Sequence, residues 1–220
     1  MSLKLLYDEF HKKALQVNVD KFNYVKQSTT IKLNEDVYFL PKKIQTYIES
    51  NLKTVYKINY KYKDIIIKLH YNTTKTVSKE FFKELLYRIV FLMTVCNKFI
   101  NLNLIIYDTP FKKKFDCSKY DKCKKILGPD NINSGYSYTN NIVIFRKEEL
   151  TKLIIHETIH CLDIDVKYEE PKLNKHLQDL FCIKSRDFLV NESYVETWSS
   201  IIHIFLLNYY KFRNYDYDIF

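Results

Sequence analysis

The clearest chemical signal in this chain comes from two histidines and a glutamate in one short segment. Residues His156-Glu157-Thr158-Ile159-His160 have the spacing HExxH. Four residues of helix turn the chain by roughly 400°, so both imidazoles point the same way, one turn apart. Neutral imidazole nitrogens suit zinc, and the neighbouring carboxylate can accept a proton from water at the metal. The spacing predicts that His156 and His160 bind Zn2+ and that Glu157 is the catalytic base.

The residues around the motif are mostly apolar, which indicates a helix that faces the protein interior. They are Leu153, Ile154, Ile155, Ile159 and Leu162. Histidines on a buried helix need polar partners. Backbone carbonyls of the core could satisfy them, and this is the alternative to a metal site. The order of strands and helices around the motif favours the metal.

A catalytic zinc site needs a third protein ligand and keeps its fourth position for water and substrate. In the spacing HExxHxxGxxH this ligand is a histidine, but Asp163 and Val166 occupy the glycine and histidine positions here. The segment 191–198, NESYVETW, offers two glutamates one helical turn apart instead. We assign Glu192 as the ligand and Glu196 as the acceptor of an imidazole N–H, which fixes the metal-binding tautomer. The reverse assignment remains open.

HETIH and the downstream NESYVE resemble the gluzincin metallopeptidases, over residues 135 to 200. In these enzymes a glutamate on a second helix completes the zinc site of the HExxH helix. The resemblance implies an α+β, zincin-like fold, with a small mixed sheet packed on the HExxH helix and on the second ligand-bearing helix. It also implies peptide-bond hydrolysis, with extended substrate pairing along an edge strand, the place that residues 136–146 take in this chain.

The chain departs from the gluzincin pattern in three respects. The spacing to the third ligand is longer than in thermolysin, Glu196 stands where the family has Asp, and no motif identifies an oxyanion donor. By residue type alone the candidate donors are Tyr168, His176, Tyr194 and His203. His203 is too far along the helix from Glu196 to bind the same ion, so a core or supporting role is favoured.

A wider pattern is similar to uncharacterised metallopeptidase-like proteins of large DNA viruses. It consists of a Lys-rich loop, then Asn133-Ser134-Gly135, a strand pair and HETIH. That resemblance implies a protein of an infected host cell or of the virion.

Hydrophobic spacing predicts the elements that position the motif. Apolar residues recur at helical spacing from Leu3 to Leu15, and a second helix follows Pro41. Residues 55–71 alternate and pivot at Lys63-Asp64, as two antiparallel strands do. Further elements are a nearly buried helix that begins after Ser78, a strand at 102–107, strands at 136–138 and 142–146 joined at Asn140-Asn141, and a helix at 148–162 with acidic residues in its first turn.

No linker or repeat divides the chain, so we interpret residues 1–220 as a single zincin-like domain. Residues 1–75 form a subdomain of helices and a hairpin in this interpretation, and residues 76–220 form the catalytic core.

The composition indicates a folded globular protein. Of 220 residues 46% are hydrophobic and only 2 are Gly and 4 Pro, which excludes disordered and collagen-like chains. The longest apolar run, 89–96, is shorter than the roughly 20 residues that cross a bilayer, so we expect no membrane span. Charged residues interrupt the segment 1–16, so we expect no signal peptide. The 5 cysteines indicate reduced thiols and therefore an intracellular, cytoplasmic protein, with a Cys117–Cys123 disulfide as the alternative.

The net charge of +9 is compatible with an acidic partner. Seven lysines lie between Lys112 and Lys125, where solvation is the simplest explanation. A second hypothesis is a basic protein that binds nucleic acid or acidic polypeptides through these lysines and has a structural or inactive zinc site. We find no stacking platform or helix-turn-helix signature, so we expect a peptide or protein substrate, acidic if the lysines guide it, and not nucleic acid. The oligomeric state is left open.

Overall fold

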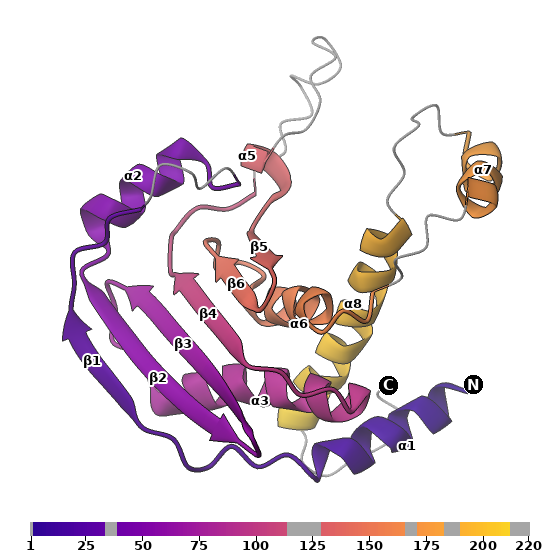
Figure 1. Cartoon of the computed structure of the whole chain (residues 1–220), viewed down its shortest axis with the longest axis horizontal. Coiled ribbons are helices and arrows are strands. Elements are labelled where there is room, and N and C mark those ends of the chain that lie inside the picture. Colours follow the sequence, from indigo (N-terminus) through magenta and orange to yellow (C-terminus); the bar gives the residue numbers. More distant parts are fainter. Residues whose placement is uncertain (1, 34–38, 114–128, 166–170, 183–189, 212–220) are drawn as a thin grey trace.

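The structure is a computed structural model that describes residues 2–33, 39–113, 129–165, 171–182 and 190–211. Within these ranges six strands form one mixed sheet in the order β1-β2-β3-β4-β6-β5 (Figure 1). The strands are β1 (Tyr24–Ser28), β2 (Thr54–Tyr62), β3 (Ile65–Thr73), β4 (Leu102–Tyr107), β5 (Gly135–Tyr138) and β6 (Asn141–Ile144). The helices are α1 (Leu3–Ala14), α2 (Lys42–Asn51), α3 (Lys79–Cys96), α5 (Pro129–Ile132), α6 (Leu150–Cys161), α7 (Pro171–Leu180) and α8 (Val190–Lys211). The predicted α+β class is confirmed.

The sheet combines parallel and antiparallel pairs. Strands β3, β4 and β6 are parallel neighbours, whereas β1, β2 and β5 pair antiparallel with their neighbours. The predicted hairpin between β2 and β3 is confirmed, because Tyr62 pairs with Ile65 and Lys63 in the turn has a φ of 51°. Strand β5 is an edge strand beside helix α6. This placement puts the end of the sheet next to the HExxH residues.

Helix α3 is the central helix of the core. Its N-terminus is capped by Ser78, whose side-chain oxygen accepts a hydrogen bond from the N–H of Phe81 at 3.2 Å. Asn97 ends the helix in a left-handed conformation with a φ of 50°. Every residue from Leu85 to Thr94 is buried. The predicted start and the near-complete burial of this helix are confirmed.

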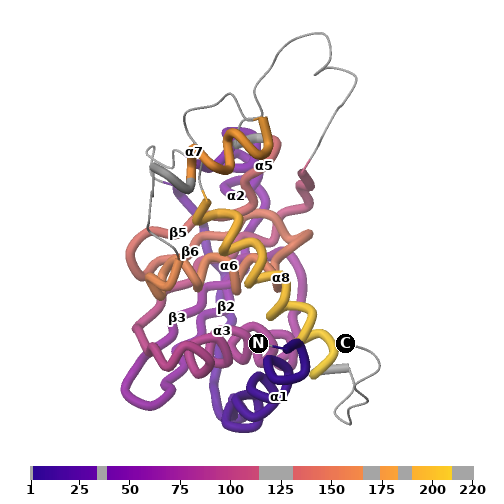
Figure 2. The backbone as a smooth tube through the Cα atoms, turned by 90° about the vertical axis from the view of Figure 1, so that its right-hand side faces the viewer, coloured from indigo at the N-terminus to yellow at the C-terminus, as the bar shows by residue number. Residues whose placement is uncertain are grey.

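One face of the sheet packs against helices α1, α3, α6 and α8, where the larger hydrophobic core lies. Figure 2 shows α8 passing α6 and ending beside α1. Aromatic contacts join these helices: the ring of Phe10 on α1 lies 5.7 Å from that of Phe91 on α3 and 5.3 Å from that of Phe205 on α8. The core thus fixes the position of α8 relative to α6.

The opposite face of the sheet is covered only in part. Helix α2 lies over one end of it (Figure 1), where a second, smaller core forms. That core consists of Leu40, Ile44, Ile48, Leu52, Tyr107, Val143 and Phe145. Beyond α2, side chains of β2, β3 and β4 on this face are exposed.

Two boundaries differ from the predictions. Helix α6 begins at Leu150, so the acidic residues expected in its first turn precede the helix. They interact with Lys113 instead, because Glu149 forms an ion pair with its ammonium and Glu148 accepts a hydrogen bond from its backbone N–H at 2.5 Å. The turn between β5 and β6 consists of residues 139–140, because Tyr138 pairs with Asn141.

No helix in the described ranges combines the length and apolar character that crossing a membrane requires.

Candidate metal centre

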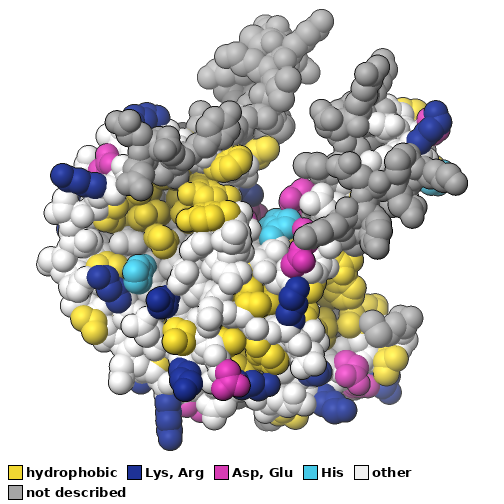
Figure 3. All heavy atoms as spheres, in the orientation of Figure 1, with side chains coloured by type: hydrophobic (Ala, Val, Ile, Leu, Met, Phe, Trp, Pro, Cys, Tyr) yellow, Lys and Arg dark blue, Asp and Glu magenta, His cyan; other side chains and the backbone are white. Residues whose placement is uncertain are grey.

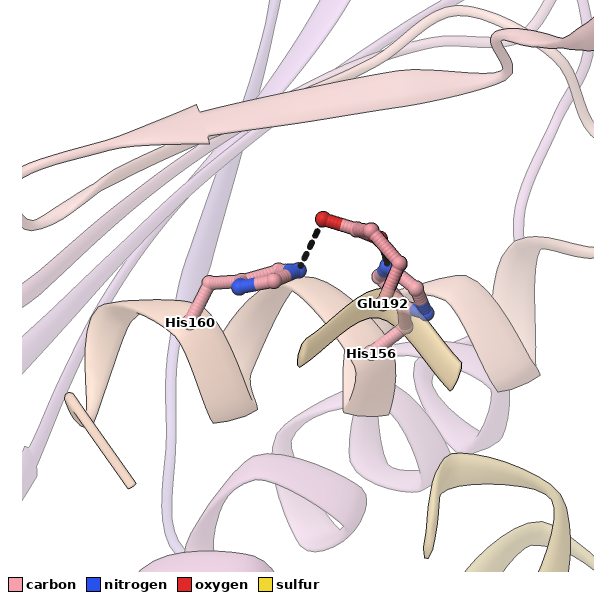
Figure 4. A group of neighbouring side chains, drawn as sticks. All are labelled: His156, His160 and Glu192. Carbon is pink, nitrogen blue, oxygen red and sulfur yellow. Dashed lines mark ion pairs between the residues drawn. The ribbon is translucent and has the colours of Figure 1, made fainter. Parts of the chain in front are cut away.

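Helices α6 and α8 bring His156, His160 and Glu192 together (Figure 4). One carboxylate oxygen of Glu192 lies 3.5 Å from Nε2 of His156, and the other lies 3.5 Å from Nε2 of His160. The three potential ligand atoms all lie within 4.8 Å of one another. Atoms bound to tetrahedral zinc at about 2.0–2.1 Å are about 3.3 Å apart. The two 3.5 Å separations are close to this value, and atoms that lie up to 4.8 Å apart would move closer together around a zinc ion.

Packing on both helices explains why the polar side chains meet. Ile154, Ile155 and Ile159 bury one side of α6 in the core, which turns the two imidazoles toward the start of α8. The hydroxyl of Thr158 is satisfied within the helix by the carbonyl of Ile154, at 2.6 Å. On α8, the buried side chain of Val195 faces the core, while Glu192 and Glu196 are exposed toward the imidazoles.

The second nitrogen of each imidazole also faces a carboxylate. Nδ1 of His156 lies 3.3 Å from Glu196, and Nδ1 of His160 lies 3.0 Å from Asp165. A carboxylate that accepts the Nδ1–H leaves the Nε2 lone pair directed at the ion. Glu196 has the position expected of it, and the carboxylate also forms an ion pair with Lys152. Asp165 was not predicted, because a single aspartate after a helix has no characteristic spacing.

The electrostatics of the cluster favour a positive charge between the helices. Hydrogen bonds to His156 and His160 hold the pKa of Glu192 well below its ordinary value. The hydrogen bond to Glu192 is the largest cause that raises the pKa of His160, to about 9, with Asp165 adding to it and burial opposing it. Without a metal, the proton on His160 therefore provides positive charge that the carboxylate of Glu192 attracts. A divalent cation would replace that proton.

Glu157 is the most buried acidic side chain of the cluster, with 6% of its surface exposed. Burial raises the pKa of its carboxyl group, while a hydrogen bond from Ser137 and the two nearby imidazoles lower it. Ser137 lies on the edge strand β5, so this bond connects the strand with the HExxH helix. Sequence reasoning missed Ser137. Side chains alternate between the two faces of a strand, so Ser137 lies on the face opposite to Tyr136 and Tyr138. This alternation is the signal that could have identified Ser137.

The predicted oxyanion donors lie elsewhere or outside the described residues. Nδ1 of His203 accepts a hydrogen bond from the buried guanidinium of Arg88 at 3.1 Å, and burial lowers the pKa of this histidine. His176 is exposed on α7. Tyr194 lines an apolar cavity of about 330 Å³ between α1, α3, α6 and α8. Tyr168 lies outside the described ranges, so no donor is assigned among the residues that the structure describes.

The remaining predictions concern cysteines and lysines. Cys96, Cys161 and Cys182 are free thiols. Burial raises the pKa of Cys161 to about 12, so this thiol next to the motif stays protonated and is a poor zinc ligand. The cysteine pair 117/123, most of the lysine-rich segment and Val166 lie outside the described residues.

No protein-family model matches the chain, and the searches of curated proteins and of solved structures found no similar protein.

Proposed function

We propose that this protein is a zinc-dependent hydrolase of peptide bonds, with a gluzincin-like centre in a zincin-like domain. The observation that carries the proposal is the position of Glu192, whose two oxygens each lie 3.5 Å from Nε2 of one HExxH histidine. A carboxylate from a second helix thus supplies the third ligand that the motif requires.

The donor set favours zinc over the common hard cations. Two imidazole nitrogens and one carboxylate are typical ligands of catalytic zinc, whereas Ca2+ and Mg2+ prefer sites composed of oxygen atoms. His156, His160 and Glu192 would hold the ion, and Glu196 and Asp165 would orient the imidazoles through Nδ1. Three protein ligands leave a fourth position for water or substrate.

Zinc in this position would supply Lewis acidity to the attacking water and to the carbonyl group of the substrate. The protein residues supply proton transfer and orientation. Glu157 is one residue from His156, and its raised pKa makes the carboxylate a stronger base than an exposed one. Glu157 takes the proton of the water and later donates it to the leaving amine. Ser137 fixes the orientation of this carboxylate through its hydrogen bond.

The edge strand β5 is suited to hold an extended peptide. It pairs with β6 on one side, and no described strand pairs with its other side. Main-chain hydrogen bonds to such an edge bind extended peptides with little regard for sequence. Figure 3 shows a histidine and acidic side chains next to one another at the surface. A peptide along β5 would pass over these groups.

The test compares Glu157→Gln with the wild-type protein. We expect purified wild-type protein to contain about one zinc ion per chain and to cleave members of a random peptide library, as followed by mass spectrometry. Glu157→Gln should retain zinc, because residue 157 is not a ligand, and lose activity by about 10²–10⁴-fold. Glu80→Gln, on the exposed start of α3, is the matched control and should keep full activity. Absence of zinc, absence of cleavage, or an active Glu157→Gln variant would each refute the proposal.

A further inference from the structure

The face of the sheet that α2 leaves uncovered presents a polar and basic surface. On β2, Lys57, Asn59 and Lys61 are exposed and alternate with the buried residues of the opposite face. On β3, Ile66 and Lys68 are exposed in the same way. Figure 3 views this face, and lysine and hydrophobic side chains are spread over it. We call it the open face.

The strand register aligns hydrogen-bonding side chains across the open face. Asn59 pairs with Lys68, Lys68 with Asn103, Asn103 with Asn141, and Asn141 with Tyr138. This row crosses β2, β3, β4, β6 and β5, a distance of about 19 Å at the usual strand spacing. The amide of Asn103 donates to the side-chain oxygen of Asn141 at 3.2 Å. A linear ligand could therefore meet donors and acceptors along its whole length.

The charged side chains on the strands of the open face have one sign. None of the six described strands contains an aspartate or a glutamate. Lys57 and Lys68 both lie close enough to His70 to lower the pKa of its imidazole, in addition to the larger effect of burial. A polyanion would find only attractive charges on these strands.

Aromatic rings end the row at β5. The rings of Tyr136 and Tyr138 stack with centroids 6.1 Å apart, and Tyr138 is 54% exposed. Phe39 lies against Tyr136 at 5.7 Å and is 48% exposed. Exposed rings on a sheet are stacking platforms for unpaired bases. No stacking platform was expected from the sequence, and the exposed rings of Tyr138 and Phe39 are the feature that leads us to consider one.

We propose that the open face binds single-stranded nucleic acid, with Lys57, Lys61 and Lys68 at the phosphates and Tyr138 stacked on a base. The aromatic end distinguishes this ligand from an acidic polypeptide, which would use the lysines but has no bases for the rings. The width of the row suits the two or three bases that four-stranded RNA-binding sheets hold. This surface is formed without the metal centre, so the proposal does not depend on the proposed hydrolase.

The first test measures fluorescence anisotropy of labelled 12-nucleotide single-stranded RNA and DNA against salt concentration. The variant Lys57→Gln/Lys61→Gln/Lys68→Gln should bind at least 10-fold more weakly. A plot of its log affinity against log salt concentration should have a slope that is less steep by about 2, because each of the three lost phosphate contacts contributes about 0.7 to the slope. A control removes the same charge from exposed lysines outside the sheet, as Lys4→Gln/Lys12→Gln/Lys21→Gln, and should change affinity less than 3-fold.

The second test distinguishes the contribution of stacking on bases from the contribution of charge to binding. Tyr138→Ala should weaken binding by about 5-fold or more, whereas Tyr138→Phe, which keeps the ring, should bind as the wild type does. Circular dichroism melts establish that each variant is folded. Glu157→Gln protein in EDTA should bind with unchanged affinity. No binding by the wild-type protein, equal losses in both lysine variants, or polyglutamate binding as tightly as RNA and insensitive to Tyr138→Ala would overturn the proposal.

Discussion

Asp165 lies 3.0 Å from Nδ1 of His160, so the second histidine of the HExxH motif finds its partner in the chain just beyond its own helix. The first histidine, His156, finds its partner Glu196 on α8. Each imidazole is thus oriented by a carboxylate from a different element. The two carboxylates can be tested separately.

Asp165→Asn should weaken zinc binding by about 10–100-fold, the usual effect of removing a carboxylate partner of a ligating histidine. The affinity is measured by competition with a chromophoric zinc chelator. Asp163→Asn is a matched control two positions away, where the side chain is exposed and the backbone has a φ of 53° that Asn tolerates. Equal affinities for Asp165→Asn and the control would show that Asp165 does not orient His160.

Alanine variants of the two glutamates on α8 should differ in zinc content. Glu192→Ala removes the proposed third ligand, and we expect the purified variant to have lost most of its zinc. Glu196→Ala removes only an acceptor of His156 and should retain zinc with affinity reduced by about 10–100-fold. Elemental analysis after dialysis against a weak chelator measures both. The opposite ranking would make Glu196 the ligand, which is the reverse assignment left open by the sequence.

The sequence predicted the elements whose own residues carry a periodic signal. The α3 helix was recognisable from its apolar run and from Ser78, and the β2–β3 hairpin from its alternation around Lys63. Strand β1 was missed because all five of its residues are exposed, so Tyr24–Ser28 has no buried face to produce alternation. The helical spacing in HETIH and NESYVE predicted which side chains share a face, and the structure brings those faces together.

Features that depend on distant pairing were not predictable from local patterns. The parallel pairing of β4 with β3 and β6 joins residues about 35 to 40 positions apart, and no single strand encodes it. The open face arises from that pairing, because Lys68, Asn103 and Tyr138 become neighbours only in the assembled sheet. For this reason the sequence directed attention to the lysines of residues 112–125 and not to those of the strands.

Gly135→Ala should destabilise the edge of the sheet. A Cβ at this position would lie 2.7 Å from the carbonyl oxygen of Val143 and 3.2 Å from Leu153 on α6, and the backbone oxygen cannot move away easily. Overpacking of this kind costs about 1–3 kcal/mol. We expect the melting temperature to fall by about 2–10 °C. Ser193→Ala on the exposed face of α8 is the control and should change stability little. An unchanged melting temperature for Gly135→Ala would mean that β5 can shift freely.

The metal-free protein should lose stability as the pH rises through the range in which His160 titrates. The pKa of His160 is raised from 6.5 to about 9 in the folded protein, mainly by Glu192. A group whose pKa is higher in the folded state contributes its full stabilisation of the folded protein below about pH 6.5. This contribution disappears as the pH rises through about 9. Urea denaturation in EDTA between pH 6 and 9.5 measures the loss.

Zinc should remove most of this pH dependence above neutral pH, because the ion displaces the imidazole proton and binds the same nitrogen. Calorimetry in buffers with different ionisation enthalpies should then show about one proton released per zinc at pH 7.5. Glu192→Gln removes the largest cause of the raised pKa, so the EDTA-treated variant should have a flatter stability profile between pH 6.5 and 9. If the wild-type and Glu192→Gln proteins had the same profile without metal, the ion pair between α6 and α8 would not form in solution.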